Sequence, residues 1–260
     1  MGLKLNKVNY KDKLKNINYE FEEGKITSII SSSGSGKTIL SYIISGIEKP
    51  TSGEVINTYQ GREIGYIFQN AEESFIFSTV REELIFGLRR YNYKIDNLNK
   101  RIEDSLKMVG LPLEYLNKNP FELSSGEKEM LSIAIVLSLN PKLIIIDDPT
   151  IYLDNKKEEF LIKLLKKLKN NYNKTIIIFS SDIDFILKLS DNYIILKNGK
   201  ISSEGTNKEL LINNDKLKKA GIEVPKILEF INSVKKSKNI ELEQTFDIKE
   251  LMKDIYRNVK

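Results

Sequence analysis

Two adjacent aspartates, Asp147 and Asp148, end a short apolar run in the stretch LIIIDDPT, residues 143–150. An apolar run that is closed by a turn signal such as Pro149 predicts a buried strand of a parallel sheet. Two carboxylates at the tip of one strand repel each other unless a cation lies beside them. The pair therefore predicts a site that also holds a metal ion or a basic side chain.

A glycine cluster, SSSGSGKT at residues 31–38, supplies the second part of this chemistry. It lies between a strand pattern and a helix pattern, where a phosphate-binding P-loop belongs, although its first position is Ser31 instead of glycine. Gly34 and Gly36 permit positive φ, so backbone N–H groups can point at phosphate oxygens beside the positive end of the next helix. The alternative is an ordinary polar turn. The residues expected to bind nucleotide are Ser31, Ser32, Ser33, Gly34, Ser35, Gly36, Lys37 and Thr38.

The P-loop assigns roles to its last two residues and to the first aspartate. Lys37 is expected to reach the β- and γ-phosphates, and the Thr38 hydroxyl to ligate Mg²⁺. Asp147 ends an apolar strand, as the Mg²⁺-holding aspartate of P-loop nucleotidases does. Mg²⁺ and Lys37 would be the cations that let two acids lie side by side.

The elements that must position these residues alternate along the chain. Strand patterns at 26–30, 63–70, 143–146, 175–182 and 191–201 are separated by helix patterns at 38–47, about 80–123, 127 onward and 155–171. Strands that alternate with helices predict an α/β fold with a parallel sheet, here the P-loop NTPase fold. From about residue 207 the chain becomes polar and mostly helical, which is also how a simple cap on the domain would look.

Composition excludes several classes of site and function. There is no His and no Cys, which removes imidazole catalysis, thiolate metal sites and disulfides. Only six of the 41 basic residues are Arg and the Lys residues are spread along the chain, which argues against a nucleic-acid reader. No signal peptide opens the sequence, and the longest apolar run, Met130 to Leu139, is too short to cross a bilayer. We expect a soluble, cytoplasmic protein that reaches a membrane only through a partner.

Five motifs occur in the order and spacing of an ABC-type ATPase, which residues 1–210 resemble. FQN at 68–70 is similar to the Q-loop, LSSGE at 123–127 to the ABC signature, DDPT at 147–150 to the Walker B end and YLD at 152–154 to the D-loop, while FSSD at 179–182 stands where the switch histidine normally lies. The resemblance implies that Gln69 lies near Mg²⁺ and the attacking water, that Asp148 is the general base and that Ser181 takes the switch position.

The resemblance also implies that the signature serves the ATP site of an opposite subunit. The signature residues are Ser124, Ser125, Gly126 and Glu127, with the Ser124 hydroxyl and the Gly126 backbone expected at the γ-phosphate of the partner's ATP. Tyr10 is the candidate for stacking on adenine, although a core tyrosine fits this position equally well. ATP and Mg²⁺ are the expected cofactors, and a second ABC ATPase subunit is the expected partner.

Two phrases resemble the ATPases of energy-coupling factor (ECF) transporters more narrowly: FQNAEESFIFSTVREELIFGL at 68–88 and AGIEVPKILEFINSVKK at 220–236. This similarity implies a multi-span membrane scaffold protein, a membrane substrate-binding subunit and a place on the cytoplasmic face of the membrane. The importer would take up a vitamin or a transition-metal ion, which the sequence does not distinguish. Residues 80–122 are then a helical subdomain that grips the scaffold, and residues 211–260 a C-terminal segment that supports dimerisation.

Four departures from the family pattern bear on hydrolysis. Asp148 stands where Glu is usual, Ser181 where His is usual, Ser125 where Gly is usual and Glu127 where Gln is usual. Asp is about 1.5 Å shorter than Glu, and a Ser hydroxyl carries no positive charge toward a phosphate. We therefore expect tight Mg-ATP binding, slow turnover at this P-loop and a heterodimer whose partner has the faster site. A slow homodimer, an ATPase of another ABC transporter, a nucleotide-binding pseudo-ATPase and a soluble ABC scaffold protein are the alternatives.

Overall fold

The structure, a computed structural model, describes residues 2–32, 34–92, 97–238 and 248–258. Ser33, one of the expected P-loop residues, lies outside them. Six strands form the main sheet in the order β5-β6-β7-β3-β8-β9. They are β3 (Ile26–Ser31), β5 (Ile64–Ile67), β6 (Leu143–Asp147), β7 (Thr175–Ser180), β8 (Asn192–Lys197) and β9 (Lys200–Thr206).

The predicted α/β fold with a parallel sheet is confirmed, with one antiparallel edge. β5, β6, β7, β3 and β8 run parallel to one another, and β9 returns antiparallel to β8 through a tight turn. Strands β3, β6 and β7 are buried along their whole length, which explains why their sequences are nearly continuous apolar runs. The carboxyl ends of these three strands therefore meet at one edge of the sheet.

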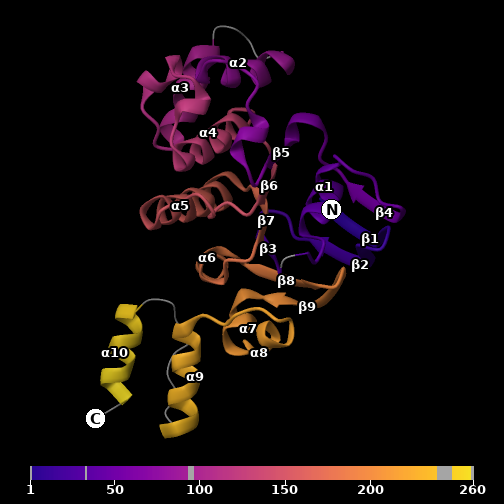
Figure 1. The fold of residues 1–260 in the computed structure, drawn as a ribbon, viewed down its shortest axis with the longest axis vertical. Helices are drawn as coiled ribbons and strands as arrows, with labels where there is room; N and C mark the ends of the chain where they lie inside the picture. The colour runs from indigo at the N-terminus through magenta and orange to yellow at the C-terminus, as the bar shows by residue number, and fades with distance from the viewer. Residues whose placement is uncertain (1, 33, 93–96, 239–247, 259–260) are drawn as a thin grey trace.

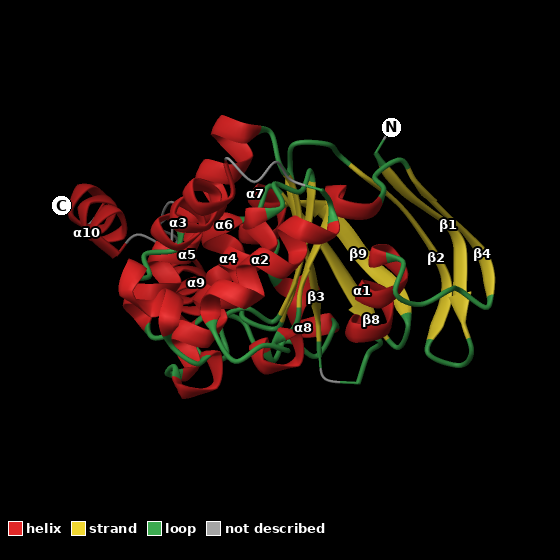
Figure 2. Cartoon of the chain, turned by 90° about the horizontal axis from the view of Figure 1, so that it is seen from above, coloured by secondary structure: helices red, strands yellow, loops and turns green. Residues whose placement is uncertain are grey.

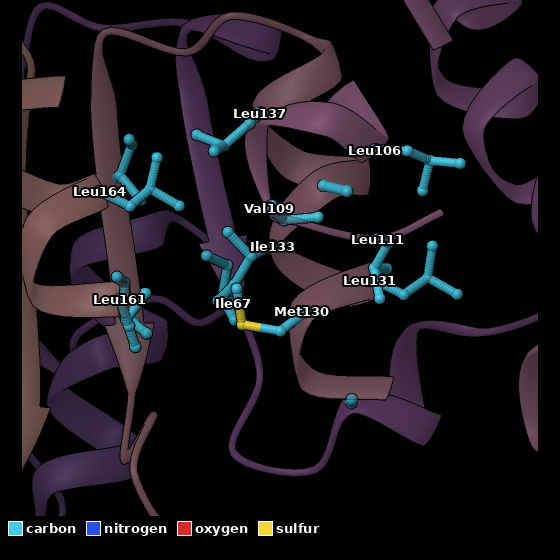
Figure 3. Packing of buried hydrophobic residues seen from close by; sticks show 14 of the residues in the cluster. Ile67, Leu106, Val109, Leu111, Met130, Leu131, Ile133, Leu137, Leu161 and Leu164 are labelled. Atoms are coloured by element: carbon cyan, nitrogen blue, oxygen red, sulfur yellow. The ribbon is translucent and has the colours of Figure 1, made fainter. Parts of the chain in front are cut away.

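Helices cover both faces of the main sheet. Alternate side chains of β6 point to opposite faces, so Ile144 and Ile146 pack with α4 (Ser125–Ser138) and α5 (Asn155–Tyr172), while Leu143 and Ile145 pack with α1 (Lys37–Ser45). Figure 3 shows the first of these cores, where Ile67, Met130, Ile133 and Leu161 lie close together. The α6 helix (Ile183–Leu189) lies toward the β8 side of the main sheet (Figure 1).

The strands that open the chain form a separate sheet, which sequence patterns did not predict. β1 (Leu3–Tyr10), β2 (Leu14–Phe21) and β4 (Ser52–Asn57) pair antiparallel in the order β2-β1-β4. This small sheet lies beside α1, on the right of Figures 1 and 2. Its buried residues Leu5, Leu14 and Ile17 belong to the same core as α1, so the β1–β2 hairpin sits against the start of that helix.

A helical layer joins the sheet at the β5 end. It contains α2 (Val80–Arg90), α3 (Leu98–Met108) and short 3₁₀ turns at Ala71–Ser74, Leu113–Asn117 and Pro120–Glu122, with another 3₁₀ turn at Gly61–Glu63 before β5. Leu84, Leu88, Ile102 and Leu106 pack into the same core as α4. Arg101 donates to the backbone oxygen of Ser138 at 2.6 Å, which fixes α3 against the end of α4.

The C-terminal helices pack on α6. They are α7 (Asn207–Ile212), α8 (Asp215–Lys219), α9 (Lys226–Lys238) and α10 (Ile248–Asn258). Leu228, Ile231 and Leu251 from α9 and α10 share one core with Ile183 and Ile186 of α6. In the described part of the chain, every helix is too short or too polar to cross a membrane.

Candidate nucleotide-binding site

A cavity of about 450 Å³ lies at the carboxyl edge of the main sheet. It brings together residues that are up to 168 positions apart in the chain, counted from Lys13 to Ser181. Its lining residues are Lys13, Gly34, Gly36, Lys37, Thr38, Ile39, Gln69, Asp148, Ile151 and Ser181. A larger cavity of about 540 Å³ lies between α6 and residues 223–227, but the P-loop residues Lys37 and Thr38 line the 450 Å³ cavity, which is therefore the candidate site.

The P-loop turns from β3 into α1 through two glycines with positive φ, Gly34 at +77° and Gly36 at +100°. A side chain at Gly36 would meet Leu14 Cδ2 at 2.9 Å and the backbone oxygen of Lys13 at 3.2 Å, so the β1–β2 hairpin requires glycine there. Ser35 Oγ donates to the backbone oxygen of Ser32 at 2.8 Å and closes the turn. Because α1 begins at Lys37, the positive end of its dipole faces the cavity.

The cation beside the two aspartates is Lys37, and it pairs with the second of them. Lys37 Nζ lies 2.8 Å from Asp148 Oδ2, and both side chains are nearly buried, at 12% and 11% exposure. Asp148 has a φ of +45°, and its backbone N–H donates to the oxygen of Phe179 at 2.7 Å. The backbone N–H of Ser181 donates to Asp148 Oδ1 at 3.2 Å. The proposed base and the switch position are therefore in direct contact.

Asp147 has a different environment. It is 2% exposed, and its Oδ2 lies 3.4 Å from the Tyr66 hydroxyl and 3.5 Å from Ser41 Oγ. Its Oδ1 is buried and has no hydrogen-bond partner among the residues that the structure describes. Burial, and then the charge of Asp148, raise the pKa of Asp147 to about 6, against the opposing effects of Lys37, Tyr66 and Ser41.

These residues fit Mg²⁺. A buried carboxylate oxygen without a protein partner favours a cation, and the other candidate ligands, Thr38 and Gln69, carry the hard oxygen donors that Mg²⁺ prefers. Within the described ranges, no three acidic side chains gather into a metal site. Mg²⁺ at this edge would then depend on phosphate oxygens for the rest of its ligands.

Gln69 reaches the cavity from the end of β5, where the chain crosses to the helical layer. The ring of Phe68 packs edge-on against Tyr66 with centroids 4.7 Å apart. Asn70 then accepts the backbone N–H of Glu72 and caps the 3₁₀ turn at Ala71–Ser74. Gln69 therefore sits at the joint between the sheet and the helical layer.

The signature residues Ser124, Ser125, Gly126 and Glu127 begin α4, and none of them lines the P-loop cavity. Ser124 Oγ donates to Glu127 Oε2 at 2.6 Å, and Tyr115 donates to Glu127 Oε1 at 2.8 Å. These two bonds lower the pKa of Glu127 to about 2. A side chain at Gly126 would lie 3.1 Å from the backbone oxygen of Tyr152, so the signature packs against the YLD stretch.

Tyr10 and Lys13 come from the same hairpin but are placed differently. Tyr10 ends β1, and its ring packs against the core beneath the small sheet, with Lys11 Nζ 5.1 Å from the ring centroid. Tyr10 is not among the residues that line the described cavity, whereas Lys13 is. Sequence patterns missed Lys13 because a lysine among several in a polar hairpin gives no signal of where it points. They missed Ser41 and Tyr66 because a hydroxyl on a helix or a strand likewise gives no signal of which group it contacts.

Several known proteins are similar to this chain in sequence and fold. The ABC transporter family profile matches residues 14–151. The energy-coupling factor transporter ATP-binding protein EcfA2 of Clostridium perfringens is 31% identical over 94% of this chain and 92% of its own length. The structure of cbiO1 from Clostridium perfringens, part of the ABC transporter complex cbiONQ, is 29% identical with a TM-score of 0.74 over 88% of this chain and 98% of that one. The dimeric ATP-binding cassette MJ0796 bound to ADP and Pi is 33% identical with a TM-score of 0.70 over 79% and 98%.

Proposed function

The chain belongs to the ABC transporter family, and on that premise we propose that it is the ATP-binding subunit of an importer of the energy-coupling factor type. The observation that carries this proposal is the single cavity that Gly34, Lys37, Thr38, Gln69 and Asp148 line together. Each group has a partner on a nucleotide: backbone N–H groups and Lys37 for phosphates, Thr38 and Gln69 for Mg²⁺, and Asp148 for the attacking water.

In the proposed function, Lys37 exchanges partners when nucleotide binds. In the structure its ammonium is bound to Asp148 at 2.8 Å, whereas a P-loop lysine binds the β- and γ-phosphates. We propose that the phosphates draw Lys37 away, and that Asp148 keeps its bond to the Ser181 N–H and gains a water molecule. Mg²⁺, held by Thr38, Gln69 and Asp147, would neutralise charge on the phosphate oxygens.

The hydrolytic half of the site is proposed to be slow. Asp148 is about 1.5 Å shorter than a glutamate, and a misplacement of about 1 Å can cost roughly 100-fold in rate. Ser181 contributes its backbone N–H to Asp148 and has no positive charge to offer a γ-phosphate. We propose a heterodimer in which the second ATPase subunit supplies the faster site.

The transporter partners are inferred from the similarity to the ECF ATPases and from exposed apolar side chains. Ile76, Phe86 and Phe121, in the helical layer, are 71%, 48% and 47% exposed and would contact the multi-span scaffold protein. Residues 211–260 would support dimerisation, and a membrane substrate-binding subunit would select the vitamin or transition-metal ion. The chain would then work on the cytoplasmic face of the membrane without entering it.

Nucleotide binding and turnover are tested separately. Calorimetry should show one ATP per chain in Mg²⁺, and single-turnover measurements on the assembled ATPase pair should give a slow rate at this P-loop. Asp148→Glu combined with Ser181→His should raise that rate. A P-loop that binds no ATP would contradict the proposed function. An unchanged rate in the double variant would contradict only the claim that these two positions limit turnover, and would favour a nucleotide-binding pseudo-ATPase.

A further inference from the structure

We propose that Tyr66, supported by Ser41, is a positioning residue that orients Asp147 so that one carboxylate oxygen is reserved for Mg²⁺. The inference rests on the proposed function, because it concerns the metal bound with the nucleotide. Neither hydroxyl lines the cavity, so both would act through Asp147 and not on the nucleotide itself.

The two carboxylate oxygens of Asp147 differ in their hydrogen-bond partners. Oδ2 faces both hydroxyls, Tyr66 at 3.4 Å and Ser41 at 3.5 Å, while the buried Oδ1 has no hydrogen-bond partner within the described ranges. A carboxylate that is held at one oxygen by a donor keeps its rotation fixed, and the second oxygen stays available as a ligand. The contacts with the hydroxyls would thus fix which carboxylate oxygen of Asp147 faces the metal ion.

Tyr66 is the principal donor because the Ser41 hydrogen has a competing acceptor. Ser41 Oγ lies 2.8 Å from the backbone oxygen of Thr38, one turn back along α1, and also 2.8 Å from the Tyr66 hydroxyl. Ser41 can give its hydrogen to Thr38 or to the Tyr66 oxygen, and in either case Tyr66 can supply the hydrogen that Asp147 Oδ2 accepts. Once Asp147 is ionised, its carboxylate is the stronger acceptor for the Tyr66 hydrogen. The Tyr66 ring is held by Phe68 and Tyr42, with centroids 4.7 and 5.7 Å away.

The contacts among Ser41, Tyr66 and Asp147 also link the segments that carry the three expected Mg²⁺ ligands. Ser41 lies on α1, three residues after Thr38. Tyr66 lies on β5, three residues before Gln69, and Asp147 ends β6. β5 pairs with β6 in parallel register, with Tyr66 opposite Ile145. A shift of either α1 or β5 relative to β6 would therefore be transmitted to Asp147 through these hydroxyls.

The test measures Mg²⁺ affinity apart from nucleotide affinity. With the full-length chain saturated with ADP, a Mg²⁺ titration should show that Tyr66→Phe weakens Mg²⁺ by about tenfold, the lower end of what removal of an outer hydrogen-bond partner costs a metal site. ADP affinity in excess EDTA should stay within about twofold of the wild type, because Tyr66 does not line the nucleotide cavity. Tyr42→Phe is the matched control, since it removes a hydroxyl from the neighbouring ring and leaves the Asp147 contacts in place.

Mn²⁺ bound in the ADP complex gives a second readout by electron paramagnetic resonance, whose line shape should change in Tyr66→Phe and not in Tyr42→Phe. An unchanged Mg²⁺ affinity in Tyr66→Phe would overturn the inference and leave the proposed function standing. An equal loss of ADP affinity in Mg²⁺ and in EDTA would do the same. If Mg²⁺ does not change the ADP affinity of the wild-type chain, both the inference and the proposed function are overturned. If Tyr66→Phe does not fold, Ser41→Ala decides, with an expected loss of about threefold in Mg²⁺ affinity.

Discussion

Lys37 holds the Asp148 carboxylate in the structure, and in the proposed function the same ammonium binds phosphate. Lys37 and Asp148 are each close to 90% buried, so neither charge can be left alone without a large cost. In the proposed function, nucleotide binding would do two things at this residue pair: it would satisfy Lys37 with a stronger anion, and it would release Asp148 for water. The P-loop lysine and Asp148, which follows β6, are thus linked by their ion pair.

Lys37→Ala should lower ATP affinity by at least about 100-fold, because it removes the ammonium that pairs with Asp148 in the cavity, and charge-assisted bonds to phosphate are among the strongest. Calorimetry with ATP and Mg²⁺ measures the change. Lys169→Ala is the control, since Lys169 pairs with Asp191 at a similar 2.9 Å and lies outside the cavity. Equal losses in the two variants would mean that ion-pair removal, and not phosphate binding, explains the result.

The site residues that sequence reasoning could find are those in motifs with fixed spacing. The P-loop, Gln69 and the two aspartates follow strands whose ends must meet, so their convergence could be predicted before the structure. Ser41, Tyr66 and Lys13 could not, because a hydroxyl on a helix or a lysine in a hairpin acquires its role only from the element packed against it.

At the scale of elements, α4 carries the signature at its exposed end and a buried acid one turn further on. Glu129 is 1% exposed, and neither carboxylate oxygen has a hydrogen-bond partner in the part of the chain that the structure describes. Burial raises the pKa of Glu129 to about 8. The folded chain therefore holds this proton at pH values where the unfolded chain, with an ordinary glutamate pKa, has released it.

Glu129→Gln should remove a pH dependence of stability. Because the folded-state pKa is the higher one, the folded state binds more protons between pH 4.5 and 8, and the wild type loses stability as pH rises through that window. The variant should match the wild type near pH 4 and exceed it at pH 9 by an amount on the order of 5 kcal/mol. Urea unfolding at both pH values measures the difference, and a constant difference across the range would contradict the account.

The start of the helical layer is held by a second buried acid, Glu83. Its carboxylate accepts the backbone N–H of Phe77 at 2.6 Å and that of Ile76, which presents the 71%-exposed Ile76 side chain outward. Glu83→Ala should leave ATP affinity within about twofold, because the contact is remote from the cavity, while it weakens assembly with the membrane scaffold. Recovery of the scaffold with the tagged variant measures this, and full recovery would show that the Ile76–Phe77 conformation is not needed.

The predicted elements were mainly those with strong local signals. The buried strands β3, β6 and β7 and the amphipathic α5 were predicted from apolar runs and helical spacing. The separate sheet of β1, β2 and β4 was not, because β4 follows α1 and pairs with a strand more than 40 residues earlier, as Leu3 opposite Asn57 shows. Strand pairing over such separations is set by packing on α1 and not by any local pattern.

At the scale of the whole molecule, the P-loop residues and the signature residue Ser125 line two different cavities. The P-loop cavity contains no signature residue, and the signature packs with Asn70 and Tyr152 around a smaller cavity of about 210 Å³. In the proposed function, a second cassette would supply the signature that this P-loop lacks. The C-terminal helices lie at the far end of the molecule from the helical layer (Figure 1), and they leave Phe230 and Tyr256 exposed at 48% and 72%.

Replacing both exposed aromatics, Phe230→Ser with Tyr256→Ser, should weaken dimerisation by at least about tenfold if these helices support it, because buried aromatic side chains dominate most interfaces. Sedimentation of the ATPase pair over a concentration series measures the dissociation constant. Ile47→Ser, at a 55%-exposed apolar position outside the C-terminal segment, is the control. An unchanged dissociation constant in the double variant would place the dimer contacts elsewhere.

The most direct measurement is to purify the tagged full-length chain gently from its native membranes and to identify the proteins that accompany it. The account predicts a second ABC ATPase and a multi-span membrane protein in fixed ratio with this chain. Recovery of the chain alone, in the soluble fraction, would contradict the transporter function.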